Sequence, residues 1–333
     1  MSESGEGLSA VCDGPRVDVI IAAWNRADTI ERAIRSALDQ EGLGRVVVVD
    51  DASIDDTLAR IEALARADAR VVAVGLPVNR GPAAARNAAL ALACAPFVTI
   101  LDADDYLLPG RLVGLMAWAS DQDFVADDLV RVEDHSLGPA TTPSVSDQAA
   151  FAPWSLDFET FVRGNIARRG RPRRELGFFK PLIRLEFLRQ HALAYDEGLR
   201  LGEDFDLYAR ALRAGARFRV VPALGYVSVT RVGSLSGRHG RTDLQRLLER
   251  TLALDGPGLS RRERIALAAL GRSLDARIQW LLLIDAVKAR EWGGMVRPFR
   301  RSFTVTGFLL ANLGDQVVRR SFSCLRGFWE TRR

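Results

Sequence analysis

Three carboxylates at the end of an apolar segment are the most concentrated chemical feature of the sequence. Asp102, Asp104 and Asp105 follow directly on the run 97–101, Phe-Val-Thr-Ile-Leu, which has the pattern of a buried strand. Carboxylates this close together need compensating charge when they leave water. Hard cations such as Mg²⁺ supply it and bind phosphate oxygens as well. The run therefore predicts a metal and phosphate site, and the alternative is a simple turn or helix cap.

A second acidic cluster lies about a hundred residues further on. The run 202–206, Gly-Glu-Asp-Phe-Asp, begins an amphipathic pattern that Gly215 ends, so Glu203 and Asp204 are predicted at the start of a helix. A carboxylate at this place is a routine helix cap. It is also suited to accept a proton from a reacting hydroxyl as a general base. The residues alone leave both interpretations open.

Alternating strands and helices must position the first acidic run. Short apolar segments alternate with helical patterns over residues 17–102, and this order predicts an α/β fold with a doubly wound, mostly parallel sheet. The predicted strands are 17–23, 45–50, 71–75 and 97–102, and the predicted helices are 29–40, 53–67 and 82–93. Asp28 and Glu31 have the spacing of a capping box, and Ser53 is the predicted cap of the second helix.

The polar residues follow the strands at their carboxyl ends, where open α/β sheets bind ligands. Asn25 comes after the first strand, Asp51 after the second and Asp102 after the fourth. The sequence contains neither Gly-x-Gly-x-x-Gly nor a Gly-Lys-Ser/Thr loop. Dinucleotide-dependent oxidoreductases and P-loop enzymes therefore lose their main support.

The composition is that of a globular protein with a large core. The chain has 333 residues, of which 48% are apolar and 26% charged. It has no run of about 18 apolar residues, and its start lacks the features of a signal peptide, so we expect a cytoplasmic protein. Cys12, Cys94 and Cys324 are far apart, which indicates neither a disulfide framework nor a zinc site.

The charge is unevenly distributed. The formal net charge is +4, but residues 241–333 carry 18 Lys and Arg against 9 Asp and Glu, so the rest of the chain is acidic. Residues 168–174 add five arginines in what reads as a loop. Such segments suit anionic lipid, phosphorylated substrate or nucleic acid, and the alternative is a solvated surface. The C-terminal pattern also mixes aromatic residues with arginine, which is typical either of interfacial helices or of helices that pack on another domain.

Five segments, in order, resemble the inverting family 2 glycosyltransferases with a GT-A fold. They are 17–25 (Val-Asp-Val-Ile-Ile-Ala-Ala-Trp-Asn), 48–57 (Val-Val-Asp-Asp-Ala-Ser-Ile-Asp-Asp-Thr), 79–87 (Asn-Arg-Gly-Pro-Ala-Ala-Ala-Arg-Asn), 101–105 (Leu-Asp-Ala-Asp-Asp) and 195–207 (Tyr-Asp-Glu-Gly-Leu-Arg-Leu-Gly-Glu-Asp-Phe-Asp-Leu). The resemblance covers roughly residues 16–235. It implies a catalytic domain over 16–240, with a nucleotide-sugar half at 16–105 and an acceptor half at 106–240. A basic, mostly helical region, 241–333, follows.

The resemblance implies a set of nucleotide-sugar-binding residues at the strand ends. The set is Ala22, Trp24, Asn25, Asp51, Arg80, Arg86, Asp102 and Asp104. Asp51 matches the position that accepts a hydrogen bond from the base, typically uracil. Ala22 and Trp24 would line the base pocket, and Arg80 or Arg86 would approach the diphosphate. The alternatives are that Asp51 caps the next helix and that the arginines are exposed helix charges.

The resemblance also implies a metal site and a catalytic base. Asp104 and Asp105 match the metal and ribose ligands, with Mg²⁺ or Mn²⁺ as the cofactor. Family members often add a histidine, for which His239 is the nearest candidate, although a loop histidine is more often solvated. Asp204 matches the base that deprotonates the acceptor hydroxyl, with Glu203 beside it.

The implied activity is transfer of a sugar, with glucose as the expected one, from a UDP-sugar to a hydroxyl of a glycan acceptor. The expected acceptor is linked to a lipid diphosphate, and the expected process is synthesis of bacterial exopolysaccharide. The Gln-x-x-Arg-Trp motif of processive synthases is missing, which favours addition of one sugar at a time. We expect an enzyme at the inner face of the membrane and no nucleic-acid partner. The alternatives are a nucleotidyltransferase and a catalytically silent relative that binds glycan or membrane.

Overall fold

A computed structural model describes residues 16–133, 151–166, 176–230, 240–303 and 305–315. His239, the arginines of 168–174, Cys12 and Cys324 lie outside these residues. The chain divides into two compact units. The first comprises Met1–Phe161 and Glu175–Gly237, and the second comprises Val162–Arg174 and Arg238–Arg333.

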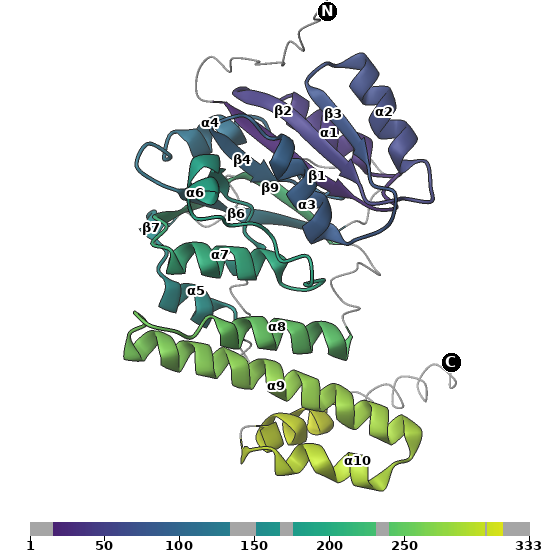
Figure 1. The fold of residues 1–333 in the computed structure, drawn as a ribbon, viewed down its shortest axis with the longest axis vertical. Helices are drawn as coiled ribbons and strands as arrows, with labels where there is room; N and C mark the ends of the chain where they lie inside the picture. The colour runs from purple at the N-terminus through teal and green to yellow at the C-terminus, as the bar shows by residue number, and fades with distance from the viewer. Residues whose placement is uncertain (1–15, 134–150, 167–175, 231–239, 304, 316–333) are drawn as a thin grey trace, which may run out of the picture. The chain divides into compact units, whose positions relative to one another are not determined.

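The first unit is built on a single mixed sheet (Figure 1). Its strands are β1 (Val17–Ala23), β2 (Leu43–Asp50), β3 (Val71–Gly75), β4 (Phe97–Ile100), β5 (Tyr106–Leu107), β6 (Phe124–Glu133), β7 (Trp154–Ser155), β8 (Leu182–Arg184) and β9 (Phe218–Thr230). Their order is β3-β2-β1-β4-β8-β6-β9-β5, with β7 paired to β9. The first four strands are parallel to one another, as predicted. The later part adds antiparallel pairs, β4 with β8 and β6 with β8, so the whole sheet is mixed.

Helices alternate with the parallel strands in the predicted order. In the first unit they are α1 (Ile30–Leu38), α2 (Thr57–Ala67), α3 (Pro82–Leu92), α4 (Arg111–Met116), α6 (Leu185–Gln190), α7 (Glu203–Arg213) and the 3₁₀ turn η2 (Leu176–Phe178), with α5 (Phe158–Gly164) at the boundary of the units. The chain runs from β1 outward to β3 and then returns to the other side of β1 with β4. The carboxyl ends of β1 and β4 therefore form the switch point at which such sheets bind ligands.

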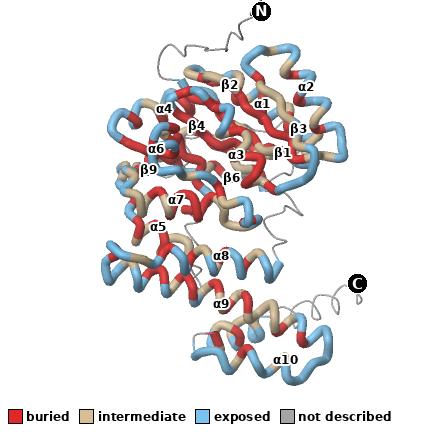
Figure 2. The backbone as a smooth tube through the Cα atoms, viewed as in Figure 1, coloured by how far each residue is buried: buried red, intermediate tan, exposed pale blue. Residues whose placement is uncertain are grey.

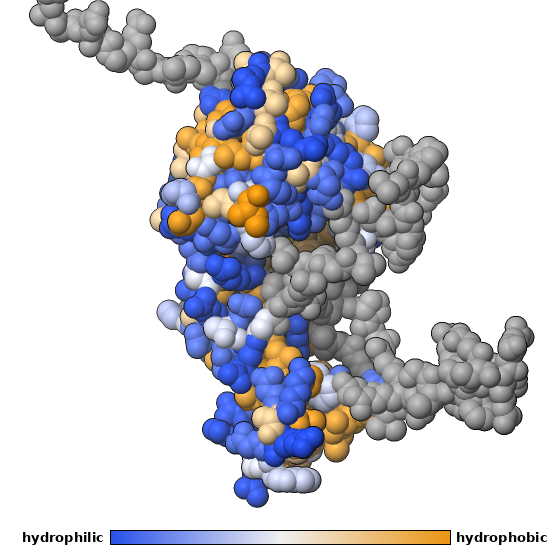
Figure 3. All heavy atoms as spheres, turned by 90° about the vertical axis from the view of Figure 1, so that its right-hand side faces the viewer, coloured by the Kyte–Doolittle hydropathy of each residue, from blue (hydrophilic) through white to orange (hydrophobic). Residues whose placement is uncertain are grey.

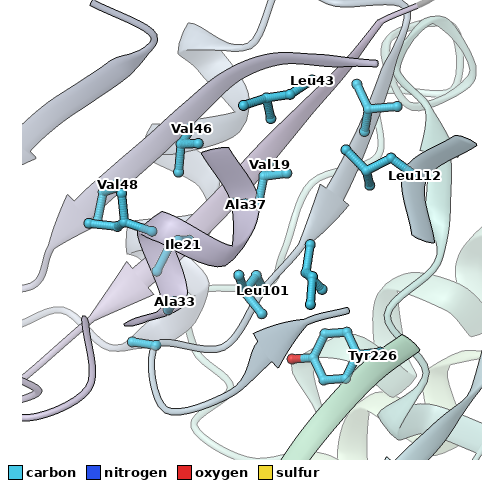
Figure 4. Packing of buried hydrophobic residues seen from close by; sticks show 14 of the residues in the cluster. Val19, Ile21, Ala33, Ala37, Leu43, Val46, Val48, Leu101, Leu112 and Tyr226 are labelled. Atoms are coloured by element: carbon cyan, nitrogen blue, oxygen red, sulfur yellow. The ribbon is translucent and has the colours of Figure 1, made fainter. Parts of the chain in front are cut away.

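The core of this unit lies between the parallel strands and their helices. Strands β1 and β2 read as continuous apolar runs because a parallel sheet is covered on both faces. Helix α1 buries Ile30, Ala33, Ile34 and Ala37, which are spaced to form one apolar face. Figure 2 shows the central strands as buried, and Figure 4 shows how their aliphatic side chains pack with those of α1. This packing holds the strand ends, and the polar residues that follow them, in fixed positions.

Two predicted helix caps are wrong. The capping box of Asp28 and Glu31 does not form, because Thr29 occupies the N-cap of α1 and Glu31 pairs instead with Arg35, 2.8 Å away. Ser53 does not cap α2, which begins only at Thr57. Its hydroxyl accepts a hydrogen bond from the Asn25 backbone N–H at 2.8 Å. Ser53 therefore ties together the loops that follow β1 and β2, and this tertiary contact competes with local capping.

The second unit is mostly helical over its described residues, as predicted for the region beyond residue 240. It contains α8 (Arg241–Ala253), α9 (Arg261–Ala289), α10 (Trp292–Val296), the 3₁₀ turn η4 (Arg297–Arg300) and a helical stretch at 305–315. A buried cluster joins α9 to this last stretch through Ala276, Leu283, Val305 and Leu309. None of the helices in the described ranges combines the length and the apolar character needed to cross a membrane.

Candidate active site

The loop after β2 is built around the buried carboxylate of Asp51. Its two oxygens accept hydrogen bonds from the backbone N–H groups of Arg80 and Gly81, each at 2.7 Å. Gly81 has φ +91°, which a residue with a side chain rarely adopts, and it is the N-cap of α3. Asp51 therefore fixes the turn into α3, and each oxygen keeps a second lone pair for another donor.

The loop after β1 presents an aromatic side chain. Trp24 is 40% exposed, one of the large apolar side chains that the first unit leaves accessible. Asn25 has φ +50°, and its side-chain oxygen accepts a hydrogen bond from the Ile54 backbone N–H at 2.9 Å. Asn25 thus joins the loops after β1 and β2 twice, through this side chain and through its backbone N–H, which donates to Ser53.

Arg86 is neither an exposed helix charge nor a free cation. Its side chain is buried on α3 and contacts three carboxylates at once. One terminal nitrogen lies 2.7 Å from Glu203 and 3.0 Å from Asp204, and the other lies 2.9 Å from Asp102. Burial opposes the charged form, but the three carboxylates raise the pKa of Arg86 well above its usual value. Arg80, the other candidate, is exposed and pairs with Glu197 at 2.6 Å.

Lys180 was not predicted, and it lies at the centre of the acidic residues. Its ammonium group is 2.8 Å from Asp204 and 3.0 Å from Asp102, and its side chain is 5% exposed. Arg86 and Lys180 each bridge the same two carboxylates, so the four side chains form a closed ring of alternating charge. We call Arg86, Asp102, Lys180 and Asp204 the charge ring. Burial raises the pKa of the Asp102 carboxyl, but Lys180 and Arg86 outweigh it and hold the pKa at about 2.

One signal in the sequence could have drawn attention to Lys180. The chain has 46 Lys and Arg residues, of which only Lys180 and Lys288 are lysines. A chain that otherwise uses arginine keeps lysine where a compact charge with three donors is needed, because the guanidinium is larger and planar. Lys288 is exposed on α9, which leaves Lys180 as the buried one.

The geometry disfavours the interpretation of Asp204 as a simple helix cap. The N-cap of α7 is Gly202, with φ +75°, and no side chain caps this terminus. The two oxygens of Asp204 instead contact Arg86 and Lys180. Asp204 is buried, so these two cations compensate a carboxylate that has left water. Glu203 also contacts Arg86, at 2.7 Å.

Asp104 and Asp105 differ in how far their carboxylates are already engaged. Asp105 is buried, and its oxygens accept hydrogen bonds from the Tyr226 hydroxyl and the Val229 backbone N–H, both at 2.8 Å. Burial, with the nearby charge of Asp102, raises the pKa of Asp105 to about 7. Asp104 is partly exposed, and one of its oxygens lies 3.4 Å from the Arg26 guanidinium. Asp104 is therefore the more accessible of the two for a ligand.

The donor set suits a metal ion that is shared with a substrate. Among the described residues, no three His, Cys, Asp or Glu side chains converge to form a complete protein cage for a metal ion. Asp104 has a partly exposed carboxylate, and Asp105 adds a second hard oxygen donor next to it, whereas both oxygens of Asp102 already pair with Arg86 and Lys180. Mg²⁺ commonly binds one or two carboxylates, with phosphate oxygens and water completing its octahedron. These residues fit such an ion, which would neutralise charge on a departing diphosphate.

A buried ion pair supports the charge ring from the sheet. Arg111 and Asp127 have side chains that are 0% exposed, and they lie 2.7 Å apart. Arg111 also donates to the Lys180 carbonyl at 2.6 Å, and its guanidinium lies 5.1 Å above the Tyr226 ring. The Tyr226 hydroxyl in turn accepts a hydrogen bond from the Asp102 backbone N–H at 3.1 Å. Arg111 thus links the backbone of Lys180, through Tyr226, to the backbone of Asp102.

Comparison with known proteins gives a consistent result. The family described as Glycosyl transferase family 2 matches residues 18–166. The succinoglycan biosynthesis protein ExoU of Rhizobium meliloti (strain 1021) is 42% identical over 306 residues, which are 92% of this chain and 88% of that protein. An Escherichia coli relative, UDP-Glc:alpha-D-GlcNAc-diphosphoundecaprenol beta-1,3-glucosyltransferase WfaP, is 38% identical over 97 residues, 29% of this chain and 38% of its own length.

A solved structure extends the likeness to the fold. The mannosyltransferase PcManGT from Pyrobaculum calidifontis, solved with GDP-Man and Mn²⁺, has a TM-score of 0.55 at 20% identity. The alignment covers 91% of this chain and 87% of that one. Such a likeness supports the GT-A fold, and the roles of individual residues depend on the geometry described above.

Proposed function

The chain belongs to glycosyltransferase family 2. We propose that it transfers glucose from UDP-glucose to a hydroxyl of a glycan that is linked to a lipid diphosphate. The proposed process is exopolysaccharide synthesis. The relatives favour this choice. ExoU is by name a succinoglycan biosynthesis protein, and WfaP by name takes UDP-glucose and a diphosphoundecaprenol acceptor. Family membership removes the nucleotidyltransferase alternative. The presence of Asp51, Asp104, Asp105 and Asp204 together argues against a catalytically silent relative.

One observation carries the proposal: the charge ring joins the end of β4 to the start of α7. Asp102 follows β4 at the switch point, and Asp204 lies in the first turn of α7. This arrangement supports a site for a departing diphosphate next to the carboxylate that would accept a proton. Inversion needs these two groups on opposite sides of the anomeric carbon, with the acceptor hydroxyl deprotonated as it attacks.

The residues of the site then have separate tasks. Trp24 and Ala22 offer apolar surface for the base, and Asp51 keeps a lone pair on each oxygen for an imide N–H. Asp204 accepts the proton of the acceptor hydroxyl. Arg86 places positive charge beside Asp102, where the diphosphate would bind. A divalent cation bound with Asp104 would add Lewis-acid stabilisation of the departing charge.

Binding of the nucleotide gives the first test. UDP with Mn²⁺ is expected to raise the melting temperature. When UDP is at 100 times its Kd, binding adds about 2.7 kcal/mol to the free energy of unfolding. That corresponds to roughly 4 °C for a protein of this size. Asp104→Ala should abolish the Mn²⁺-dependent part of the shift, which differential scanning fluorimetry would measure. Asp121→Ala, at an exposed carboxylate elsewhere on the unit, is the matched control. A wild-type protein that no nucleoside diphosphate stabilises would contradict the proposal.

We also propose that the second unit binds the surface of an anionic membrane. Trp280 and Phe299 pack against the buried cluster of α9, whereas Trp292 and Phe303 are 80% and 99% exposed. Figure 3 shows hydrophobic and hydrophilic residues next to one another on the face of this region that it draws. Arg297, near Trp292 in the chain, adds positive charge. Exposed aromatic side chains among arginines suit the interface of an anionic bilayer, where each basic residue contributes about 1 kcal/mol.

Vesicle binding tests this part separately. Replacing Trp292 and Phe303 together with glutamate is expected to weaken binding to phosphatidylglycerol vesicles at least tenfold, because a buried aromatic side chain contributes about 1.5–3 kcal/mol. Co-sedimentation would measure it. Ile54→Glu, at an exposed apolar residue of the first unit, is the control and should bind as wild type. Equal binding by all three proteins would show that the aromatic residues do not contact lipid.

A further inference from the structure

Lys180 has more contacts than charge compensation alone would require. Its ammonium group lies between one oxygen of Asp102 and one of Asp204, while Arg86 takes the other oxygen of each. All four carboxylate oxygens of the pair are thus engaged by two buried cations. The consequence is geometric, because two contacts on different oxygens fix both the position and the plane of the Asp204 carboxylate.

The backbone of Lys180 is itself held rigidly. Its carbonyl accepts hydrogen bonds from Arg111, at 2.6 Å, and from the Thr99 hydroxyl, at 3.3 Å. Thr99 belongs to β4, the strand that leads to Asp102. The backbone of Lys180 is therefore held to β4, and its ammonium group contacts the carboxylate of Asp204 on α7. A displacement of α7 relative to β4 would have to stretch or break its contacts.

Helix α7 needs such a contact at its first turn. It begins after Gly202, a left-handed residue, and glycine has no side chain that could cap the N-terminus. Nothing in the first turn itself fixes the Asp204 side chain, so its orientation depends on contacts from other elements. Arg86 supplies one from α3, and Lys180 supplies the other from the segment before β8.

We propose that Lys180 is a positioning residue that holds the Asp204 carboxylate in register with Asp102, and so sets the proton acceptor against the donor site. The proposal rests on the proposed function, in which Asp204 is the base. Lys180 acts through Asp204 and contacts neither the acceptor nor the base of the nucleotide. Arg86 alone would hold one oxygen of each carboxylate, and the second oxygen of Asp204 would lose its ion pair.

Turnover of the full-length protein gives the kinetic test. Lys180→Met is expected to lower kcat for UDP release from UDP-glucose by about 100-fold, the effect of a misplacement near 1 Å. The Kd for UDP with Mn²⁺ should change less than about threefold, since the nucleotide contacts are intact. In an Asp204→Asn background the same change should lower kcat by less than about threefold, because residues that act as a unit are not additive. Lys288→Met, at the other lysine, should behave as wild type.

A double-mutant cycle of urea unfolding tests the contact between Lys180 and Asp204 without measuring turnover. Urea midpoints are measured for wild type, Lys180→Met, Asp204→Asn and the double variant. If Lys180 holds Asp204, the double variant should lose less than the sum of the two single losses. Additive losses in both midpoint and kcat, or a fall in UDP affinity that matches the fall in kcat, would overturn the proposal. A wild-type protein that releases no UDP would reject the proposed function, and the unfolding cycle would still decide whether Lys180 holds Asp204.

Discussion

Asp204→Asn is expected to lower kcat by about 10²–10⁴-fold, the usual contribution of a general base. Asparagine keeps the shape of the side chain but cannot accept the proton of the acceptor hydroxyl. UDP binding should persist, because Asp51 and the acidic run after β4 are untouched. Release of UDP, measured with and without a lipid-linked acceptor, would determine kcat, and calorimetry would determine the Kd for UDP.

Glu203→Gln provides the matched control for this prediction. Glu203 is adjacent in sequence and contacts the same Arg86, but it has no contact with Lys180 and is not the expected proton acceptor. Its replacement should therefore lower kcat much less than that of Asp204. Equal losses in the two variants would indicate that the charge of the cluster, and not proton transfer, limits turnover. A fully active Asp204→Asn protein would require another base.

The sequence predicted the parts of the site that follow from strand order. Asp51 and Asp102 were expected at strand ends because alternation of strands and helices implies a parallel sheet, and the structure places both there. The start of α7 at Glu203 was equally readable from Gly202 and the amphipathic pattern that follows. Local patterns were sufficient in these places because the backbone itself positions the residues.

Local sequence patterns did not predict the contacts that join distant segments of the chain. Arg86 and Lys180 meet the same carboxylates from positions almost a hundred residues apart, and no spacing rule connects them. Lys180 also lies outside residues 17–102, the part of the sequence in which predicted strands and helices alternate. The cap predicted for Ser53 failed for a related reason, since its hydroxyl bonds to Asn25 from the neighbouring loop. Tertiary partners overrode local propensity at each of these residues.

Arg111→Met is expected to destabilise the protein by about 3–5 kcal/mol, the typical result of removing one partner from a buried ion pair. Asp127 would remain with a charge and no exposed surface, and the Lys180 carbonyl would lose its shorter hydrogen bond. Urea unfolding would measure the loss. The same variant, assayed well below its melting temperature, should also lose turnover, because the backbone of Lys180 is no longer fixed.

Two further variants separate the buried charge from the lost side chain. Arg111→Met with Asp127→Asn removes the uncompensated charge but keeps an acceptor for the Leu224 backbone N–H, so it should recover a large part of the stability. Arg35→Met breaks an exposed pair with Glu31 on α1 and should cost about 0.5 kcal/mol or less. A double variant as unstable as Arg111→Met would show that packing of the arginine matters more than its charge. Recovery of stability without recovery of turnover would instead assign Arg111 its second task, the support of Lys180.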